Sequence, residues 1–565
     1  ALYGGGGDAA CARIVEAVVA TRDAQRSNDD QGALAVPDAW NESDVALITY
    51  GDMVREEGCS PLAALKRLLL DCRADEFLSA VHILPFFPYS SDDGFSVIDY
   101  RQVDPELGDW DDVAQLGDCF RLGFDLVLNH ISQQSEWFSG YLRGEEPYVR
   151  YFVECDPELD LRDVVRPRSL PLLTPFETSR GQRWLWTTFS ADQLDLNYAE
   201  ADVMAEMLDV LLDYLRRGAG IVRLDAVAFL WKEAGTRCLH LPKTHEAVKL
   251  MRDVLEAAAP HVWLLTETNV PHRENVSYFG NGDEAQLIYQ FSLPPLLLDA
   301  FVQGDATPLQ AWLDDWDQPP EGATYLNFTA SHDGVGVRPL EGLVDAERLH
   351  ALVDAMRARG GLVSTRRQPD GSDAPYEINI TYVDALAPDG ASGGDDHVRR
   401  FLSTQATMLA LQGVPAVYFH SLFGTQNDSS AAAATGIARR INRRKFDRPE
   451  LDRQVEDPST LSGAIHRGYQ RLLEQRRRQP AFAPQAAQHA ARFEDPGLFG
   501  FVREAVDGRQ RILVVCNVSR QTCQIDATQW LEAKAAFDLI NDEILGDARS
   551  VDVASGQIRW LTLRP

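Results

Sequence analysis

The sequence predicts an α/β protein built on a closed (β/α)8 barrel, and two observations lead to this prediction. From residue 45 onward, short apolar runs rich in β-branched residues alternate with segments whose apolar residues recur at helical spacing. Eight such runs occur, and eight strands alternating with helices are typical of a closed parallel barrel. An open doubly wound sheet is the rival architecture, but no GxGxxG motif follows the first run, so a dinucleotide site is not expected.

Each element of the barrel can be placed along the chain. The expected strands cover residues 45–50, 80–85, 124–129, 220–227, 262–267, 286–291, 324–329 and 414–420. Between them, residues 61–72 and 201–217 show clear helical spacing, and Gly218 supplies a helix stop. An earlier amphipathic helix is expected over residues 9–26, ahead of a polar stretch.

Additions to the barrel are predicted where connections are too long or where the pattern changes. The stretches that follow the third and seventh strands are longer than simple connections, and such insertions at strand ends usually build binding surfaces. Short alternating strands with turns over 498–502, 511–518 and 557–563 indicate a small all-β domain. The expected divisions are an N-terminal helical extension (1–44), a barrel (45–130 and 220–484), an inserted domain (131–219), a second insertion with a mobile loop (334–400) and a C-terminal β domain (485–565).

Composition excludes several classes of partner. The chain has 565 residues, 45 % of them hydrophobic, and a formal net charge of −31. Such an acidic balance argues against nucleic acid and anionic membranes, which require clustered positive charge. Eight scattered cysteines without a CxxC pair are typical of reduced thiols. No run of about 18 apolar residues and no signal-peptide pattern is visible, so a cytoplasmic enzyme is expected.

Three apolar runs end in an acidic residue, and these acids are the candidate catalytic groups. Asp225, Glu267 and Asp333 each stand at the C-terminal end of an expected strand, where the catalytic residues of barrels gather. A pair of carboxylates about 5 Å apart cleaves a glycosidic bond with retention. Arg223 lies two residues before Asp225 on the same face of its strand, so it is expected to lower the pKa of Asp225 and keep that nucleophile ionised.

The other two acids have different expected tasks. Glu267 follows the apolar run Trp263-Leu-Leu-Thr266, a setting in which a general acid keeps its proton. Asp333 is expected to hold sugar hydroxyls in the distorted ring, with His130 and His332 as further donors. A purely structural reading would make strand-end aspartates helix caps. No ligand spacing such as HExxH occurs, so no metal is expected.

At these residues the chain resembles the alpha-amylase family, glycoside hydrolase family 13. The characteristic stretches are Asp125-Leu-Val-Leu-Asn-His130, Gly220-Ile-Val-Arg-Leu-Asp225, Thr266-Glu267 and Ser331-His-Asp333. The resemblance covers nearly the whole chain. It implies a barrel with an inserted domain and a C-terminal β domain, with Asp225 as nucleophile, Glu267 as acid/base and Asp333 as transition-state stabiliser.

Further stretches are similar to sucrose phosphorylase and its relatives, which replace water with phosphate and release α-glucose 1-phosphate. These stretches include Val81-His-Ile-Leu-Pro-Phe-Phe-Pro88, Asp92-Asp-Gly-Phe95 and Leu230-Trp-Lys-Glu-Ala-Gly-Thr236. The resemblance implies a glucose pocket and residues beside it, namely Asp92, Phe95, His130, Arg223, His332, Phe189 and Gln193. Arg168 and Tyr376 match positions that meet phosphate or the leaving group, and a guanidinium can bind a phosphate dianion at two points.

The acceptor sugar or acid is identified by weaker features. The segments 327–334, 360–364 and 419–425 are most like those of glucosylglycerate phosphorylases. A glycerate carboxylate needs a cation, and Arg439 or Arg443 in the basic run 439–445 is the expected source. Glu377 would repel a carboxylate unless a cation lies between them. Glucosylglycerol phosphorylase, with a neutral acceptor, is therefore the first alternative, followed by sucrose 6'-phosphate phosphorylase and sucrose phosphorylase.

The expected reaction is a double displacement through a covalent glucosyl-enzyme. Its partners are a small sugar substrate and inorganic phosphate as co-substrate, without a cofactor, and the resemblance is compatible with a homodimer. An α-glucosidase or transglucosidase with the same carboxylates would release sugar without regard to phosphate. A non-catalytic sugar-binding protein would not need the three acids together.

Overall fold

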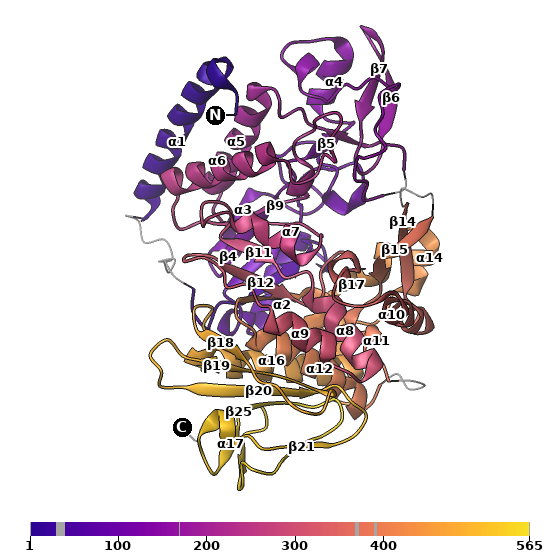
Figure 1. Cartoon of the computed structure of the whole chain (residues 1–565). Coiled ribbons are helices and arrows are strands. Elements are labelled where there is room, and N and C mark those ends of the chain that lie inside the picture. The colour runs from indigo at the N-terminus through magenta and orange to yellow at the C-terminus, as the bar shows by residue number, and fades with distance from the viewer. Residues whose placement is uncertain (1, 30–39, 169, 368–371, 389–392, 564–565) are drawn as a thin grey trace.

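The centre of the molecule is a closed barrel of eight parallel strands in a computed structural model that describes residues 2–29, 40–168, 170–367, 372–388 and 393–563 (Figure 1). In chain order the strands are β1 (Ala46–Thr49), β3 (Ala80–Ile83), β4 (Arg121–Leu126), β9 (Ala219–Leu224), β10 (Trp263–Thr266), β11 (Leu287–Tyr289), β12 (Thr324–Phe328) and β16 (Val414–Tyr418). Each is next to its sequence neighbour, and β1 closes the barrel by pairing with β16. The predicted (β/α)8 fold is confirmed.

The strands are apolar because they are buried on both faces, as in parallel barrels generally. Almost every strand residue is buried, and the barrel forms the middle of one large hydrophobic core. The eight expected runs all overlap a strand. The boundaries differ by up to three residues. The strand β4 begins at Arg121, because Arg121 already pairs with Ala80, and β4 and β9 each end three residues before the expected end. The chain after β16 turns at once into α13 (Phe419–Leu422).

Helices surround the barrel and cover the outer faces of its strands. The main ones are α2 (Pro61–Asp71), α3 (Trp110–Gly117), α5 (Ala201–Arg216), α6 (Pro242–Ala258), α7 (His272–Val276), α8 (Leu293–Gln303), α9 (Thr307–Asp314), α12 (Asp395–Ala410), α15 (Arg448–Glu456) and α16 (Leu461–Arg476). Helix α2 illustrates the local signals: Ser60 accepts a hydrogen bond from the backbone N–H of Ala63, and Pro61 occupies the first turn.

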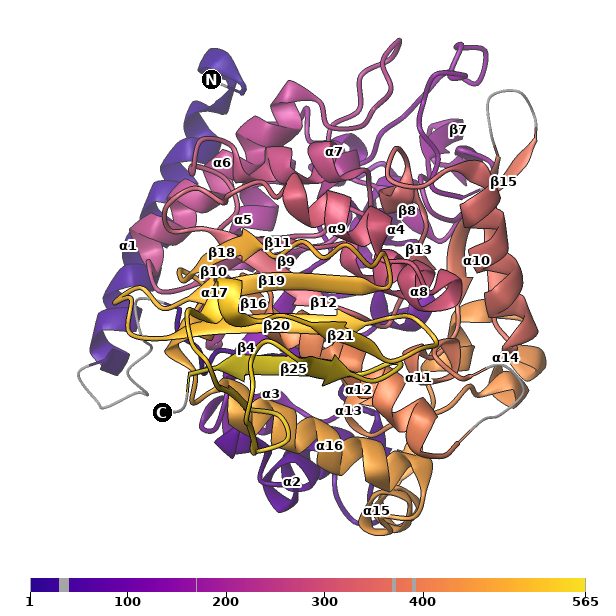
Figure 2. The same cartoon turned by 60° about the horizontal axis from the view of Figure 1, so that its bottom comes forward.

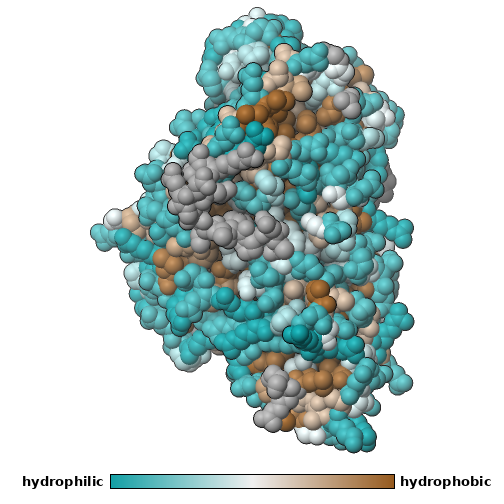
Figure 3. All heavy atoms as spheres, turned by 90° about the vertical axis from the view of Figure 1, so that its left-hand side faces the viewer, coloured by the Kyte–Doolittle hydropathy of each residue, from teal (hydrophilic) through white to brown (hydrophobic). Residues whose placement is uncertain are grey.

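The expected N-terminal helix is present as α1 (Asp8–Asp29), which lies on α5 and α6 at one side of the molecule (Figure 1). It is fixed by hydrogen bonds from Gln25 Nε2 to Leu215 O at 2.7 Å and from Arg216 Nη1 to Thr21 Oγ1 at 2.8 Å. The face that carries α1 is mostly hydrophilic with scattered apolar patches (Figure 3). This surface agrees with the strongly acidic composition. Residues 30–39 of the predicted extension (1–44) lie outside the described residues, and residues 40–44 lead into β1.

The stretch between the third and fourth barrel strands forms its own small structure. It contains α4 (Glu136–Arg143), the hairpin β6 (Leu173–Thr178) with β7 (Gly181–Trp186), and the antiparallel pair β5 (His130–Ser132) with β8 (Gln193–Asp195). The predicted range 131–219 also contains α5, which packs on β9 and α6. Helix α5 is therefore the barrel helix that precedes β9, and the insertion ends before it.

The second insertion forms a three-stranded sheet beside the mouth of the barrel. Its strands are β13 (Val335–Gly336), β15 (Asp373–Asn379) and β14 (Leu362–Arg367), with α10 (Ala346–Ala358) and α11 (Tyr382–Ala385) beside them. The predicted range 334–400 also includes the first turns of α12, which belongs to the barrel. Residues 368–371 and 389–392 of this range lie outside the described residues. Near these strands, α14 (Ser429–Thr435) precedes the basic run, and β17 (Phe446–Asp447) pairs with β2 (Val54–Arg55).

The C-terminal part is strand-rich, as predicted. Its six-stranded antiparallel sheet has the order β18 (Ala487–Ala490), β19 (Leu498–Glu504), β20 (Arg511–Asn517), β25 (Ile558–Thr562), β22 (Ala536–Asp538) and β23 (Glu543–Leu545). The pair β21 (Cys523–Ile525) and β24 (Val551–Val553) and the short α17 (Thr528–Leu531) complete it (Figure 2). Helix α12 contacts β20 and β25, which joins this sheet to the barrel. Among the described helices, none has both the length and the apolar character of a bilayer-crossing segment.

Candidate active site

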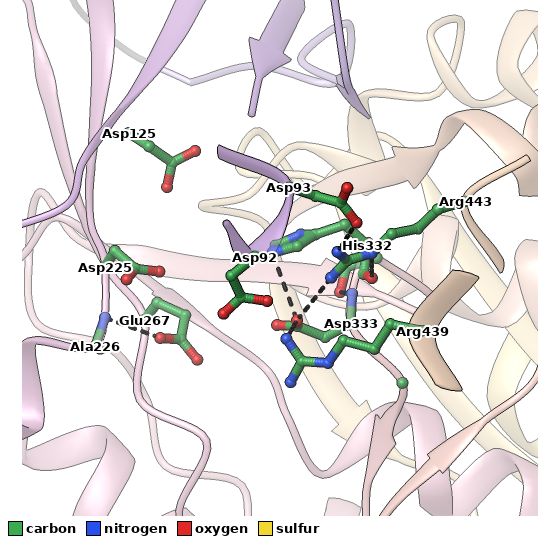
Figure 4. A network of polar contacts seen from close by, with 12 residues as sticks. Asp92, Asp93, Asp125, Asp225, Ala226, Glu267, His332, Asp333, Arg439 and Arg443 are labelled. Carbon is green, nitrogen blue, oxygen red and sulfur yellow. Dashed lines mark hydrogen bonds and ion pairs between the residues drawn. The ribbon is translucent and has the colours of Figure 1, made fainter. Parts of the chain in front are cut away.

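The three predicted catalytic acids face one cavity at the carboxyl ends of the barrel strands. Asp225 follows β9, Glu267 follows β10, and Asp333 lies in the segment after β12. Figure 4 shows their carboxylates with Asp92 among them, and all four residues line the same cavity. Parallel strands that end at one rim explain why residues distant in sequence meet here.

Arg223 supports the candidate nucleophile from inside the barrel. Its Nη1 donates to Asp225 Oδ1 at 2.9 Å and also pairs with Asp125, whose other oxygen contacts His82 Nε2 at 2.7 Å. Burial raises the pKa of Asp225, and although Arg223 opposes this, Glu267 and the other nearby acids keep that pKa well above its ordinary value. The upward shift corrects the expectation drawn from Arg223 alone.

Glu267 has fewer favourable contacts than Asp225. Its Oε2 accepts a hydrogen bond from Ala226 N at 3.0 Å, and Arg223 Nη2 lies 3.8 Å away. Burial raises the pKa of Glu267, against the opposing charge of Arg223. Because the two carboxyls interact, they bind protons as a pair. The guanidinium is closer to Asp225, so the proton that the pair retains is favoured on Glu267.

Asp333 is surrounded by cations and stays ionised. Arg439 Nη1 lies 2.5 Å from Asp333 Oδ1, and His332 Nε2 lies 3.5 Å from the same oxygen (Figure 4). Burial tends to raise the pKa of Asp333, but Arg439 and the other cations lower it overall. Burial also lowers the pKa of His332 to about 3, so its imidazole is neutral, and the Phe95 ring stacks on it with centroids 4.8 Å apart.

Asp92 projects into the cavity from a strained turn, η3 (Asp92–Gly94). Asp92 has a left-handed φ of 54°, which costs energy in a non-glycine residue and is common at functional sites. Gly94, with φ of 106°, is required because a Cβ there would lie 2.6 Å from the carbonyl oxygen of Pro85. Burial opposes ionisation of Asp92, yet the charges of Arg168 and Arg439 lower its pKa overall.

The predicted residues of the inserted region reach the same cavity. Gln193 Nε2 donates to the carbonyl oxygen of Phe95 at 3.1 Å, and His130 Nε2 contacts that oxygen at 2.8 Å. Phe189 lies beside His130, with ring centroids 5.2 Å apart. Together these contacts form one wall of the cavity next to Asp92.

Arg168 and Tyr376 lie on opposite insertions and both line the cavity. Arg168 Nη2 donates to Asp92 Oδ2 at 2.9 Å, and its guanidinium lies over the Phe189 ring at 5.8 Å. A third of the Arg168 side chain is exposed, so it can exchange this partner for a ligand. Tyr376 comes from β15 in the second insertion.

Two predicted acceptor residues lie behind the cavity wall. Glu377 is buried, and Arg439 binds it with Nε at 3.0 Å and Nη2 at 2.6 Å. Arg443, with a side chain only 1 % exposed, donates to His332 O at 2.7 Å and to Asp93 Oδ2 at 2.6 Å. Neither Glu377 nor Arg443 lines the cavity. Arg443 therefore supports His332 from outside the cavity, and Arg439 separates Glu377 from any ligand.

Several lining residues were not predicted. They are Pro167, Ala226, Ala228, Phe229, Thr268, Asn269, Val270 and Arg338. Asn269 follows Glu267 by two residues and Arg338 follows Asp333 by five, so a search of polar residues just beyond each strand end would have found both. In the described part of the chain, no cluster of His, Cys, Asp or Glu side chains has the arrangement of a metal site.

Comparisons with known proteins agree with the fold and the motifs. Residues 77–335 match the family model of the alpha-amylase catalytic domain. A relative from Allomeiothermus silvanus, named glucosylglycerate phosphorylase, is 50 % identical over 80 % of this chain and 81 % of its own. A relative of the same name from Spirochaeta thermophila is 43 % identical over 92 % of this chain and 90 % of its own.

A solved structure gives the same result in three dimensions. The crystal structure of sucrose 6F-phosphate phosphorylase from Thermoanaerobacter thermosaccharolyticum superposes with a TM-score of 0.72 at 28 % identity, covering 84 % of this chain and 94 % of that one. The barrel, the three acids at its mouth and these relatives lead to one assignment. The chain belongs to the alpha-amylase family, glycoside hydrolase family 13, together with relatives named glucosylglycerate phosphorylase.

Proposed function

We propose that this protein is a retaining α-glucoside phosphorylase that converts 2-O-α-glucosylglycerate and phosphate into α-glucose 1-phosphate and D-glycerate. The observation that carries the proposal is the set of Asp225, Glu267 and Asp333 around one cavity. The names of two relatives that are 50 % and 43 % identical to this chain support glycerate as the acceptor. The free state of all eight cysteines supports a cytoplasmic location.

The first half of the reaction forms a covalent intermediate. Asp225 attacks the anomeric carbon as the bond from that carbon to the glycerate oxygen breaks, and Glu267 transfers its proton to the departing oxygen. Arg223, 2.9 Å from Asp225, orients the nucleophile and stabilises the carboxylate before attack. Asp333, which stays ionised, stabilises the positive charge that develops on the sugar ring.

The second half uses phosphate in place of water. A phosphate oxygen attacks the anomeric carbon from the face that glycerate left, and the bond to Asp225 breaks with its electrons returning to the carboxylate. Glu267 recovers its proton from dihydrogen phosphate. We assign phosphate to Arg168 and Tyr376, because Arg168 is partly exposed and faces the cavity.

The glucosyl unit is assigned to the inner part of the cavity. Asp92 and His332 are placed to accept and donate hydrogen bonds to its hydroxyls, with Phe95 and Phe189 as apolar surfaces. His130 and Gln193 complete this group from the inserted region. Repulsion between Glu377 and a carboxylate was the reason to consider glycerol, the neutral acceptor of the first alternative. That reason does not hold, because Arg439 neutralises Glu377 and Glu377 does not line the cavity.

The test is the reverse reaction with glucose 1-phosphate and four acceptors in parallel: glycerate, glycerol, fructose and fructose 6-phosphate. Release of inorganic phosphate is expected to be fastest with glycerate. Faster reaction with any other acceptor would replace glycerate by that acceptor. Release of free glucose from glucosylglycerate at an equal rate with and without phosphate would instead identify a hydrolase.

A further inference from the structure

Arg338 is a buried cation at the cavity that the proposed mechanism does not use. It belongs to the short helix η7 (Arg338–Leu340), and its side chain is 9 % exposed. Its Nε is buried and has no hydrogen-bond partner among the described residues. Its ion pair with Glu341 spans 3.7 Å, and Arg366 approaches the same carboxylate more closely, at 2.8 Å.

The other arginines at this site already have carboxylate partners. Arg168 pairs with Asp92 at 2.9 Å, and Arg439 pairs with Asp333 at 2.5 Å. Arg223 pairs with Asp225 at 2.9 Å. A buried charge without a close counter-ion is costly, so a site that keeps one is suited to an anionic ligand group. Among the arginines that line the cavity in the described structure, Arg338 is therefore the one that has no carboxylate within 3 Å, so it can bind an anionic ligand group without giving up a close partner.

Arg338 lines the same cavity as Glu267 and Tyr376. Burial raises the pKa of Tyr376 to about 12, and the charges of Glu377, Arg439, Glu267 and Arg338 also act on this phenol. Asn269 packs against Gly336, where a Cβ would lie only 2.5 Å from Asn269 Nδ2. Asn269 lines the cavity, and its Oδ1 is buried without a partner among the described residues, so this oxygen can accept a hydrogen bond from a hydroxyl of the acceptor but not bind its carboxylate.

The chemistry of the substrate fits this arrangement. In 2-O-α-glucosylglycerate the carboxylate carbon is bonded to the carbon that carries the glycosidic oxygen. When Glu267 protonates that oxygen, the carboxylate must lie within a few bond lengths of it. We propose that Arg338 binds the carboxylate of the acceptor, with the Asn269 amide beside it, and thereby selects glycerate over neutral acceptors. This inference rests on the proposed function.

An anion at this position has two sources, the carboxylate of the acceptor and the phosphate of glucose 1-phosphate, and kinetics separate them. Arg338→Gln is compared with Arg366→Gln as a matched control. Arg366 pairs with the same Glu341 carboxylate but does not line the cavity, so its replacement removes one positive charge near Glu341 without changing the cavity wall. Each variant is assayed in the reverse direction with glycerate and with glycerol, and the KM for glucose 1-phosphate is measured separately. Arg338→Lys keeps the charge but loses the two-point contact.

For Arg338→Gln, the ratio of kcat/KM for glycerate to that for glycerol is expected to fall by about tenfold or more, the usual weight of a hydrogen bond to a charged group. The glycerol rate and the KM for glucose 1-phosphate are expected to stay within about threefold, which also shows that the variant folds. Arg338→Lys should be intermediate, and Arg366→Gln should match the parent.

An unchanged acceptor ratio in Arg338→Gln, or an equal loss with both acceptors, would overturn the assignment. A rise confined to the KM for glucose 1-phosphate would transfer Arg338 to the phosphate. If Arg338→Gln yields no folded protein, the glycerate-to-glycerol ratio of kcat/KM is measured in Arg338→Lys instead. A ratio equal to that of the parent enzyme rejects the proposal. Failure of the parent enzyme itself to use glycerate would reject the proposed function, which is a distinct result.

Discussion

Replacing Lys232 with methionine removes a buried cation that joins the barrel to the inserted region. Lys232 Nζ lies 2.6 Å from Asp195 Oδ2 and donates to Asn129 Oδ1 at 2.6 Å. The two charged side chains are 5 % and 0 % exposed. Asp195 belongs to β8 of the inserted region, and Asn129 follows β4 of the barrel and contacts His130. The ammonium therefore stabilises one wall of the cavity.

The expected loss in the free energy of unfolding follows from the Asp195 carboxylate that the substitution leaves buried without its cation. Removing one partner of a buried ion pair typically costs about 3–5 kcal/mol, because the other charge stays buried. Asp195 keeps hydrogen bonds from Thr188 N at 2.9 Å and Thr188 Oγ1 at 2.6 Å. These bonds place the expected loss at the lower end, about 3 kcal/mol of the free energy of unfolding.

Urea denaturation of the parent, Lys232→Met and Lys232→Met/Asp195→Asn at pH 8, followed by tryptophan fluorescence, measures the loss in the free energy of unfolding. The second substitution removes the orphaned charge and should recover part of the loss. Lys249→Met is the matched control, since Lys249 is 30 % exposed and its pair with Asp283 spans 3.3 Å. The reasoning is refuted if Lys232→Met unfolds at the parent midpoint at pH 8, or if the double variant is less stable than the single one.

Further predictions concern catalysis. Asp225→Asn should reduce formation of glucose 1-phosphate by about 10⁴-fold or more; a smaller loss would argue for another nucleophile. Glu267→Gln should cost about 10²–10⁴-fold with glycerate as leaving group but much less with glucosyl fluoride, whose leaving group needs no proton, and equal losses would contradict its role as acid. Because Glu267 must be protonated in the first step and its pKa is raised, the alkaline limb of kcat/KM for the parent should lie above the ordinary carboxyl range, and Glu267→Gln should lack this limb. Protonation of Asp333 should produce the acidic limb, below the ordinary carboxyl range. Arg439→Gln should raise the pKa of Asp333 and move the acidic limb of kcat/KM to higher pH. An acidic limb at the same pH as in the parent would contradict the role of Arg439 in keeping Asp333 ionised.

The strand pattern and its terminal acids could be predicted because both are local. A strand buried on both faces must be apolar, so the eight barrel strands are visible as runs, and an acid that ends such a run stands out. Asp225, Glu267 and Asp333 were found in this way. The family motifs carried the same information about His130 and His332.

Other features depend on contacts between segments far apart in sequence. The run 439–445 is basic in the sequence, but only the fold shows that Arg439 binds Glu377 and Asp333 while Arg443 lies beneath His332. The upward shift in the pKa of Asp225 likewise depends on how deeply it is buried and on which acids surround it.

By itself, the sequence determined the barrel, the identity of the three acids and the acidic character of the chain, because periodicity, residue type and composition are properties of neighbouring residues. The tertiary structure alone decided which cations are neutralised and which one, Arg338, still faces the cavity without a close counter-ion. Pairing of charges is decided by distances across the fold, and Arg338, Glu341 and Arg366 acquire their relationship only when the second insertion folds against the barrel mouth.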